Sequence, residues 1–139
     1  MKTRVLIIEP SEVIVEGLSS LLGAQTRFKV LPPLYSLEGL TERLVTGKPD
    51  VIVLNPTLAS QPAQLLGDHP TPVVALVYQY VEPLVLKRYD GTIDIRDSRG
   101  AIGETLSRVA QLSLDLNRHS LVEEKVMVPY VMHLERSVR

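Results

Sequence analysis

The sequence predicts a three-layer α/β domain in which helices cover both faces of a five-stranded parallel sheet. Three runs, at residues 4–8, 51–54 and 72–77, are almost wholly apolar, as is typical of parallel strands buried on both faces. Each of the five expected strands is followed by a helical pattern. At 139 residues and 45% hydrophobic composition, the chain has the size of one ordinary domain with a short appendage.

The first helix is expected directly after the strand over 4–8. Ser11 is a suitable N-cap, and Glu12 in the first turn is favourable against the helix dipole. We expect the helix to end near Gly23. Its apolar residues recur at helical spacing: Ile14, Leu18, Leu21 and Leu22.

A second strand is expected over residues 28–31, followed by a second helix. Ser36 is the expected cap of this helix, and Gly47 is placed to end it. The turn after Gly47 leads into the third strand, at 51–54. The apolar face of the second helix contains three leucines: Leu37, Leu40 and Leu44.

The helical signals are shorter on either side of the fourth strand. One short helix is expected around Pro62 and another from near Pro83, since proline is favoured in the first turn. A fifth strand is expected over 91–95, and Ser98 then caps a long helix. The apolar residues of that helix are Ile102, Leu106, Val109 and Ala110, continued by Leu112, Leu114 and Leu116.

From about Asn117 the helical period is lost. We therefore divide the chain into a domain over residues 1–118 and a C-terminal segment over 119–139. The segment is apolar around Pro129 but too short to form its own core. We expect it to pack on the domain, to pair with another copy, or to begin a second domain, such as an output domain.

Composition excludes several classes of protein. The 15 basic and 16 acidic residues give a net charge of -1, which removes the electrostatic argument for direct DNA binding or a polybasic membrane contact. No apolar run approaches the roughly 18 residues that cross a bilayer. The absence of cysteine excludes disulfides and thiolate metal sites, and a cytoplasmic location is expected.

Catalytic and metal chemistry is not expected either. His69, His119 and His133 are scattered along the sequence, with no carboxylate cluster near any of them. No nucleophile stands beside a base, and no paired acid and base groups are apparent. The sequence therefore predicts that the chain is not an enzyme and holds no metal.

Polar side chains follow three of the strands at the point where each strand ends. Glu9 follows the first strand, Asn55 follows the third, and Tyr78 and Gln79 follow the fourth. Carboxyl ends of neighbouring parallel strands meet at one edge of a sheet. We therefore expect Glu9, Asn55 and either Tyr78 or Gln79 to share one rim.

Three segments, at residues 5–10, 48–55 and 89–95, resemble the receiver domain of two-component response regulators. The segment at 48–55 is the most specific, because the family has a strand there that ends in the phospho-accepting aspartate. The resemblance covers about residues 1–118. It implies a flavodoxin-like sheet with strand order 2-1-3-4-5 and a role in signal transduction.

Four of the five chemical positions of that family are changed in this chain. Asn55 replaces the phospho-accepting aspartate, and only a carboxylate can form the acyl phosphate. Pro10 replaces the second residue of the acidic pair and leaves Glu9 alone, Val77 replaces the switch hydroxyl, and Ile95 replaces the lysine. The chain thus resembles an atypical receiver, or pseudo-receiver, in which phosphorylation and magnesium binding are not expected.

The changed positions carry further expectations. Glu9 is expected to be a solvated rim carboxylate rather than a residual metal ligand. Asn55 either mimics a fixed state of the switch or satisfies backbone groups at the strand end. Val77 and Ile95 are expected to enlarge the apolar core, since the charge-handling chemistry has been lost.

An interaction surface is expected around the fourth and fifth strands, where Tyr78, Tyr80 and Tyr89 cluster. In the receiver family this face commonly meets partners. Leu112, Leu114 and Leu116 exceed what one core-facing stripe needs, so they either form a dimer seam, for which Leu112 and Leu116 are the interface candidates, or receive the C-terminal segment.

Two functions remain open from the sequence. The first is a phosphorylation-independent module for protein interaction or dimerisation in signal transduction and transcription regulation. Its partner would be another protein or a second copy, with DNA contacted only through an output domain outside this chain. The alternative is a flavodoxin-like domain that binds a small ligand such as a nucleotide or flavin, although no G-x-G-x-x-G or P-loop is present.

Overall fold

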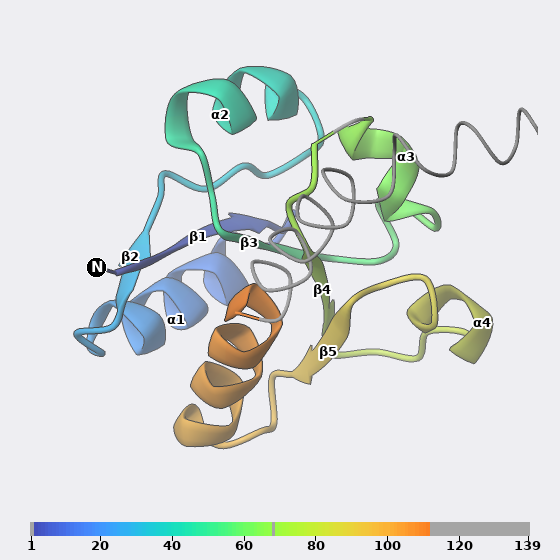
Figure 1. The fold of residues 1–139 in the computed structure, drawn as a ribbon. Helices are drawn as coiled ribbons and strands as arrows, with labels where there is room; N and C mark the ends of the chain where they lie inside the picture. Colours follow the sequence, from blue (N-terminus) through green and yellow to red (C-terminus); the bar gives the residue numbers. More distant parts are fainter. Residues whose placement is uncertain (1, 68, 112–139) are drawn as a thin grey trace, which may run out of the picture.

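Five parallel strands form a single sheet in the order β2-β1-β3-β4-β5 (Figure 1). The structure is a computed structural model that describes residues 2–67 and 69–111. The predicted C-terminal segment over 119–139, together with Leu112 and Leu116, lies outside the described residues. The elements are β1 (Thr3–Ile8), α1 (Glu12–Gly23), β2 (Phe28–Val30), α2 (Leu40–Gly47), β3 (Val51–Leu54), α3 (Pro62–Leu66), β4 (Val73–Val77), α4 (Pro83–Leu86), β5 (Gly91–Asp94) and a helix over residues 99–111.

The strand register brings the carboxyl ends of the central strands to one edge. Ile8 at the end of β1 is paired with Leu54 at the end of β3, and Leu54 is paired with Ala75 of β4. Val77 at the end of β4 is paired with Asp94 at the end of β5. The three-layer α/β class and the strand order 2-1-3-4-5 are thus confirmed.

Alternation of side chains along the strands builds two separate cores. Val5 and Ile7 of β1 face the layer formed by α1 and the helix over 99–111, and they join Leu18 and Leu106 in one cluster. Leu6 and Ile8 of β1 face the opposite layer, which contains α2 and α3. That second cluster contains Leu6, Ile8, Leu31, Leu40, Leu44 and Leu66, together with residues of β3 and β4.

Both cores contribute strongly to the fold. Leu6, Ile7 and Ile8 are fully buried, and removing one such aliphatic side chain from water contributes about 1.5–3 kcal/mol. Because β1 supplies side chains to both clusters and pairs with β2 and β3, it holds the two layers together. The residue that follows β1, Glu9, therefore leaves the sheet at a fixed position.

Serine caps begin two of the helices as predicted. The Ser11 hydroxyl accepts from the backbone N–H of Ile14 over 3.4 Å, and the Ser98 hydroxyl accepts from Ala101 over 3.1 Å. Each bond satisfies an amide that has no partner within the helix. Pro62 and Pro83 stand in the first turns of α3 and α4, also as predicted.

The second helix begins later than the sequence analysis predicts. The Ser36 hydroxyl accepts from Glu38, two residues on, which forms a local turn instead of a helix cap. Gly39 then adopts a φ of 85°, and α2 begins at Leu40. The predicted end at Gly47 is confirmed, with Lys48 in the left-handed conformation directly after it.

The fifth strand is one residue shorter than predicted, and this changes the position of Ile95. Backbone amides near the strand end bond locally, since the Asp94 carboxylate accepts from Arg96 and the Asp97 carboxylate accepts from Asp94. Ile95 lies in the resulting turn and is 41% exposed, so its predicted place in the core is wrong. Val77 is half-buried and packs against the α2 and α3 side of the sheet.

No helix in the part of the chain over 2–67 and 69–111 is both long enough and apolar enough to span a bilayer.

Candidate functional site at the carboxyl edge of the sheet

Glu9, the first residue after β1, is completely buried. The expectation of a solvated rim carboxylate is therefore wrong. Its backbone N–H donates to the carbonyl of Leu34 over 3.0 Å, so the segment after β2 is fixed against the end of β1. A buried carboxylate is costly unless hydrogen-bond donors surround it, and the neighbours of Glu9 supply such donors.

Three groups donate to the Glu9 carboxylate. The side-chain amide of Asn55 donates to one oxygen over 2.9 Å. The Tyr78 hydroxyl and the Ser11 backbone N–H donate to the other oxygen over 2.7 and 2.8 Å. Hydrogen bonds to a charged acceptor are each worth about 1.5–3 kcal/mol. Two of the three donors are neutral side chains and the third is a backbone amide.

A third side-chain contact closes a ring among these residues. The Asn55 amide also donates to the Tyr78 hydroxyl over 3.0 Å, so each of the three side chains contacts the other two. We call this arrangement the Glu9–Asn55–Tyr78 triangle. It joins the ends of β1, β3 and β4, which confirms the predicted shared rim. Of the two candidates after β4, Tyr78 takes part, whereas Gln79 is exposed.

The orientation of the Asn55 amide is set by Thr57. The Asn55 side-chain oxygen accepts from the backbone N–H of Thr57 over 2.9 Å and from its hydroxyl over 2.8 Å. The amide nitrogen must then point toward Glu9, where it finds a negatively charged acceptor. Asn55 is 4% exposed, and it satisfies a backbone group, as one of the two sequence interpretations expects.

Tyr78 is held in its neutral, donating form. Burial, the hydrogen bond to Glu9 and the negative charge of Glu9 together raise the pKa of Tyr78 to about 12, against a smaller lowering by the hydrogen bond from Asn55. Loss of the proton would leave a phenolate facing a carboxylate. The hydroxyl therefore remains a donor to Glu9 throughout the neutral pH range.

The remaining positions of the expected site bring no charge to this rim. Pro10 is exposed, and neither Val77 nor Ile95 can ionise. Arg96, the neighbour of Ile95, is 84% exposed and pairs with Asp94 over 2.7 Å. Across residues 2–67 and 69–111, no three His, Asp or Glu side chains are grouped so that they could hold a metal ion.

The predicted tyrosine surface is only partly exposed. Tyr80 is 83% exposed, but Tyr89 is 7% exposed and donates its hydroxyl to the carbonyl of Ala59 over 2.5 Å. Burial raises the pKa of Tyr89 to about 12. The structure therefore places Tyr89 in the core and removes it from the predicted interface.

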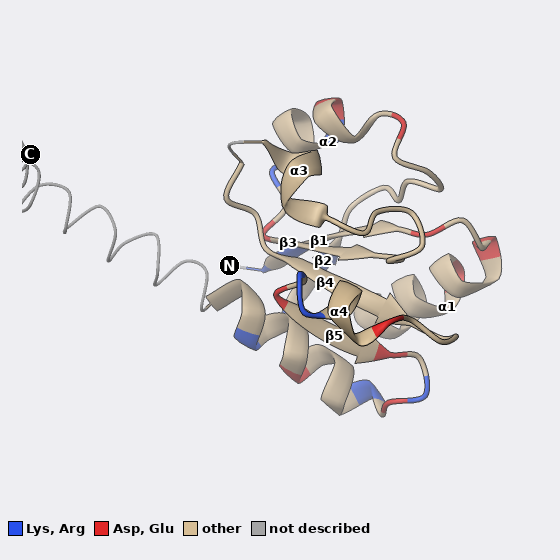
Figure 2. Cartoon of the chain, turned by 90° about the vertical axis from the view of Figure 1, so that its right-hand side faces the viewer, with Lys and Arg blue, Asp and Glu red and all other residues tan. Residues whose placement is uncertain are grey.

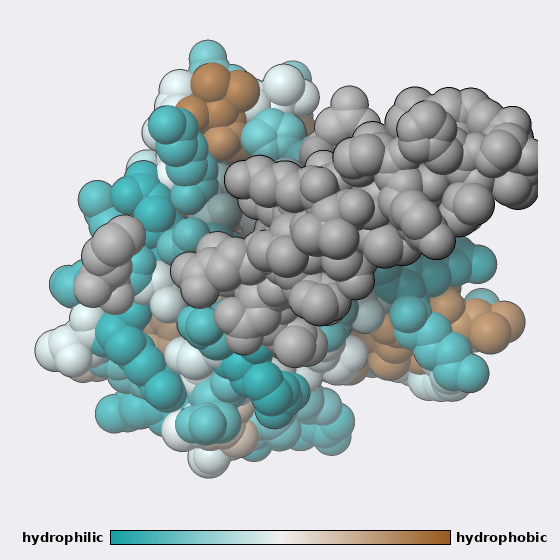
Figure 3. Space-filling view, viewed as in Figure 1, coloured by the Kyte–Doolittle hydropathy of each residue, from teal (hydrophilic) through white to brown (hydrophobic). Residues whose placement is uncertain are grey.

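An exposed apolar side chain that the sequence did not single out follows Tyr80 by four residues, in α4. Leu84 of α4 is 61% exposed, and Figure 3 shows apolar surface over α4. A hollow of about 440 Å³ is lined by Tyr78, Tyr80 and Ile95, among others. Tyr78 thus contributes both to the triangle and to a surface hollow.

Charged side chains do not suggest a nucleic-acid interface. Figure 2 shows that Lys and Arg positions along the ribbon are interspersed with Asp and Glu positions. This dispersion agrees with the net charge of -1.

Comparison with known proteins gives a short sequence match. No protein-family model matches the chain. A curated relative, protein-glutamate methylesterase/protein-glutamine glutaminase 2 of Paramagnetospirillum magneticum, is 35% identical over 83 residues, or 56% of this chain. The match with this chain covers only 24% of that relative's length.

Several solved structures with a similar fold are receiver domains of response regulators. The N-terminal domain of a response regulator/sensory box/GGDEF 3-domain protein from Carboxydothermus hydrogenoformans aligns with a TM-score of 0.63 at 18% identity, covering 85% of this chain and 98% of that chain. The signal receiver domain of an HD domain-containing protein from Pseudomonas fluorescens Pf-5 aligns with a TM-score of 0.67 at 14% identity, covering 83% and 99%. The chain therefore has the flavodoxin-like fold of response regulator receiver domains.

Proposed function

We propose that this chain is an atypical receiver that works without phosphorylation, as a protein-interaction or dimerisation module in signal transduction and transcription regulation. The observation that carries the proposal is the Glu9–Asn55–Tyr78 triangle, which fills the rim where the receiver family has its phosphorylation site. The proposal includes no catalytic activity. In it, contact with DNA would occur only through an output domain outside this chain.

The chemistry of Asn55 supports the absence of phosphorylation. An amide cannot attack a phosphodonor to give an acyl phosphate. Its oxygen is also occupied by two donors from Thr57, so its orientation is fixed by the local backbone. A phosphoryl group at this rim would bring nearly two negative charges beside buried Glu9, without a lysine to balance them.

The donors around Glu9 argue against a metal at the same place. Magnesium requires a nearly octahedral set of oxygen ligands, and a cation approaching Glu9 would have to displace the Asn55 amide and the Tyr78 hydroxyl. These two groups donate hydrogen bonds to the carboxylate without needing a counterion. In our proposal, the triangle takes the place that a metal ion would have.

The triangle also supports a constitutive role. It connects the loops that follow β1, β3 and β4, so those loops keep one arrangement relative to one another. In this proposal Asn55 also mimics one fixed state of a switch, which is the other of its two sequence interpretations. We infer that the partner recognises this single state.

The partner surface that fits this proposal lies over α4 and the turn after β5. Tyr80 and Ile95 are exposed and line the 440 Å³ hollow, and Leu84 of α4 is exposed as well. Exposed apolar groups that gather on one face are typical of protein interaction sites. Glutamate substitutions at Tyr80 and Leu84 should weaken self-association or partner capture without lowering the midpoint of thermal unfolding.

The flavodoxin-like ligand-binding alternative receives less support. The triangle occupies the rim that a ligand would use, and Glu9 and the first residue of α1, Glu12, follow β1 in place of a phosphate-binding glycine loop. A thermal-melting screen with nucleotides and flavins would identify this alternative by a ligand-dependent rise in the melting temperature.

The experiment that tests the proposal is incubation with a small-molecule phosphodonor and magnesium, followed by intact-mass analysis. We expect no added phosphoryl group under conditions that label an ordinary receiver run in parallel. A magnesium-dependent, saturable mass increase would contradict the proposal. Peptide mapping of any labelled product would then identify the acceptor residue.

A further inference from the structure

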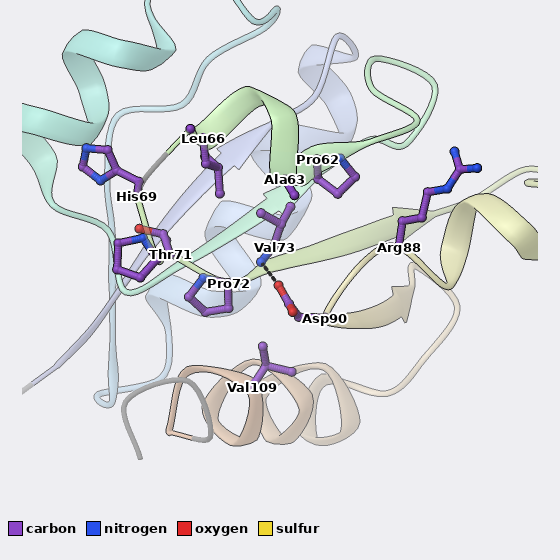
Figure 4. Close-up of a pocket in the computed structure, with 12 residues that line it drawn as sticks. Pro62, Ala63, Leu66, His69, Thr71, Pro72, Val73, Arg88, Asp90 and Val109 are labelled. Carbon is purple, nitrogen blue, oxygen red and sulfur yellow. Dashed lines mark hydrogen bonds between the residues drawn. The ribbon is translucent and has the colours of Figure 1, made fainter. Parts of the chain in front are cut away.

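Two further hollows in the described part of the chain differ in the chemistry of their linings. The first lies where β4 begins, has a volume of about 280 Å³, and includes the charged residues Arg88 and Asp90 in its lining (Figure 4). The Asp90 carboxylate already accepts from the backbone N–H of Val73 over 2.8 Å. The second has a volume of about 290 Å³, and every residue that lines it is either aliphatic or glycine. The second hollow is therefore the one that offers a purely apolar surface.

The second hollow is a groove between α1 and the helix over 99–111, which cover the same face of the sheet (Figure 1). One wall is formed by α1 and includes Val13 and Gly17. The other wall includes Ile95, in the turn after β5, and Ile102 of the helix over 99–111. We call this hollow the α1 groove.

Apolar surface of the α1 groove is exposed to solvent. Val13 is 79% exposed and Ile95 is 41% exposed. A Cβ atom placed on Gly17 would meet no heavy atom of another described element within 4 Å, so the space above this residue is open. Exposed apolar groups that gather on one face are typical of protein interaction sites. Ile95 also lines the 440 Å³ hollow, so the groove adjoins the surface that includes Tyr80.

The two walls of the α1 groove differ in charge. The charged residues of α1 are Glu12 and Glu16, both exposed, and this helix has no basic residue. The opposite wall carries Arg99, which is exposed and is the first residue of its helix. One wall is therefore acidic, and the other wall offers a cation.

The other charges near the second wall balance one another or are already bonded. Arg96 pairs with Asp94 over 2.7 Å, and this is the one ion pair among the described residues. The Asp97 carboxylate accepts from the backbone N–H of Asp94 over 3.0 Å. Arg99 is therefore the cation of this wall that an acid from another molecule can approach.

Glu16 and Arg99 flank the apolar lining at matching places. Glu16 is three residues after Val13, and Arg99 is three residues before Ile102, so each lies within about 60° of a lining residue around its helix axis. Both helices begin after the carboxyl end of a parallel strand and cover the same face of the sheet, so they run in the same direction. Each of the two charges stands near the middle of its wall.

We propose that a second copy of this chain packs on the α1 groove, about a two-fold axis that runs along the groove, so that Glu16 of each copy faces Arg99 of the other. Under such an axis each wall of one copy meets the opposite wall of the other, because the same surface is used twice. The acidic wall then faces the wall with Arg99 and never itself. Val13 and Ile95 lose their contact with water in this arrangement.

The inference deepens the proposed function by naming a second copy as one partner, and it rests on that function only in needing no phosphoryl group. Tyr80 and Leu84 do not belong to the groove lining, so the surface over α4 remains available to another protein.

Sedimentation velocity of the full chain over a wide range of concentrations measures the association. The natural chain should form dimers as its concentration rises. Glu16→Arg and Arg99→Glu should each raise the dissociation constant about tenfold or more, because like charges then meet at both contacts of the dimer. A natural chain that stays monomeric at every concentration would overturn the proposal.

Matched controls carry the same substitutions away from the groove. Glu42→Arg changes an exposed residue of α2, on the other face of the sheet. Arg108→Glu changes an exposed residue that lies about 120° from Ile102 around the helix over 99–111. Both controls should dimerise as the natural chain does. If they weaken the dimer as much as the groove variants do, the proposed surface is wrong.

Mixing the two groove variants gives the sharpest test. In a pair made of one Glu16→Arg chain and one Arg99→Glu chain, both contacts again join an acid and a base. An equal mixture should therefore dimerise at concentrations at which each variant alone is monomeric, and a mixture that stays monomeric would overturn the proposal. Thermal melts that match the natural chain establish that both variants are folded.

The outcome is separate from that of the phosphodonor experiment, because every sample is measured without a phosphodonor. Failure of the mixed pair to form rejects the α1 groove as the contact between copies and leaves the proposed function in place. A chain that dimerises as described but gains a phosphoryl group would reject the proposed function alone.

Discussion

The side-chain amide of Asn55 donates to the carboxylate of Glu9 over 2.9 Å, and both residues are buried. The two residues are separated by 46 positions in the sequence and meet because β1 and β3 are neighbours in the sheet. The contact thus pairs a neutral donor, Asn55, with a buried anion, Glu9. A carboxylate in place of the Asn55 amide would repel Glu9.

Asn55→Asp should destabilise the protein at neutral pH. The substitution replaces the donor with a second negative charge beside Glu9, and we expect the free energy of unfolding to fall by about 1–3 kcal/mol. The repulsion requires both carboxylates to be charged, so we expect part of the lost stability to return in mildly acidic solution. Urea unfolding at neutral and mildly acidic pH measures both effects.

The matched control for Asn55→Asp is Gln64→Glu, an amide-to-acid change at an exposed position of α3. This control should change the free energy of unfolding by no more than about 0.5 kcal/mol. If Asn55→Asp were as stable as the natural chain at neutral pH, the contact between Asn55 and Glu9 would not matter as we describe.

Tyr78→Phe should lower stability by about 1.5–3 kcal/mol, because it removes a donor to a buried carboxylate without changing the ring. Tyr80→Phe removes the same hydroxyl from a side chain that is 83% exposed, so it should have almost no effect. Urea unfolding of the two variants side by side measures the difference. Similar values for the two would show that the Tyr78 hydroxyl is not an important donor.

The free energy of unfolding should fall at alkaline pH because Tyr78 and Tyr89 ionise more readily in the unfolded chain than in the folded protein. The pKa values of Tyr78 and Tyr89 are about 12 in the folded protein, above the ordinary value of 10.0. Because the folded-state pKa is higher, this stability is present below pH 10 and is lost as the pH rises from 10 toward 12. Thermal melting across this range should give a weaker alkaline decline for Tyr78→Phe and Tyr89→Phe, and an unchanged decline in both variants would refute the assignment.

Ile95→Lys should leave the fold intact, although this position was expected in the core. The Ile95 side chain is 41% exposed in the turn after β5, so a lysine there can reach solvent. Ile93→Lys, two residues earlier and fully buried, should be destabilised by several kcal/mol. Circular dichroism melts of the two variants distinguish these positions, and a large loss of stability in Ile95→Lys would contradict the observed exposure.

The fold could be predicted from the sequence because its signals are local. Three strands are apolar runs, Ser11 and Ser98 cap helices as expected, and prolines begin α3 and α4. The start of α2 was missed because Ser36 bonds two residues ahead instead of three, and nothing in the sequence distinguishes these two geometries. The end of β5 was missed because the turn bonds of Asp94 and Asp97 compete with the strand.

The site was harder to predict because burial depends on contacts between distant segments. The position of Glu9 after β1 indicates a rim residue, but its complete burial results from Tyr78, which is 69 positions away, and from the chain near Leu34. The sequence predicts Tyr89 at the interaction surface, whereas in the structure it is buried and its hydroxyl donates to the carbonyl of Ala59. The sequence signal for the triangle is the tyrosine directly after β4. It predicts Tyr78 as a rim candidate but does not identify Glu9 as the partner of its hydroxyl.

The most direct measurement of the central claim is the NMR signal of the Asn55 side-chain amide during addition of beryllofluoride and magnesium. Beryllofluoride imitates a bound phosphoryl group, so it requires an aspartate acceptor and a place for the metal. Our account predicts that the Asn55 amide signals do not move, because the triangle already satisfies Glu9 and Asn55. A saturable, magnesium-dependent shift of these signals would contradict the account.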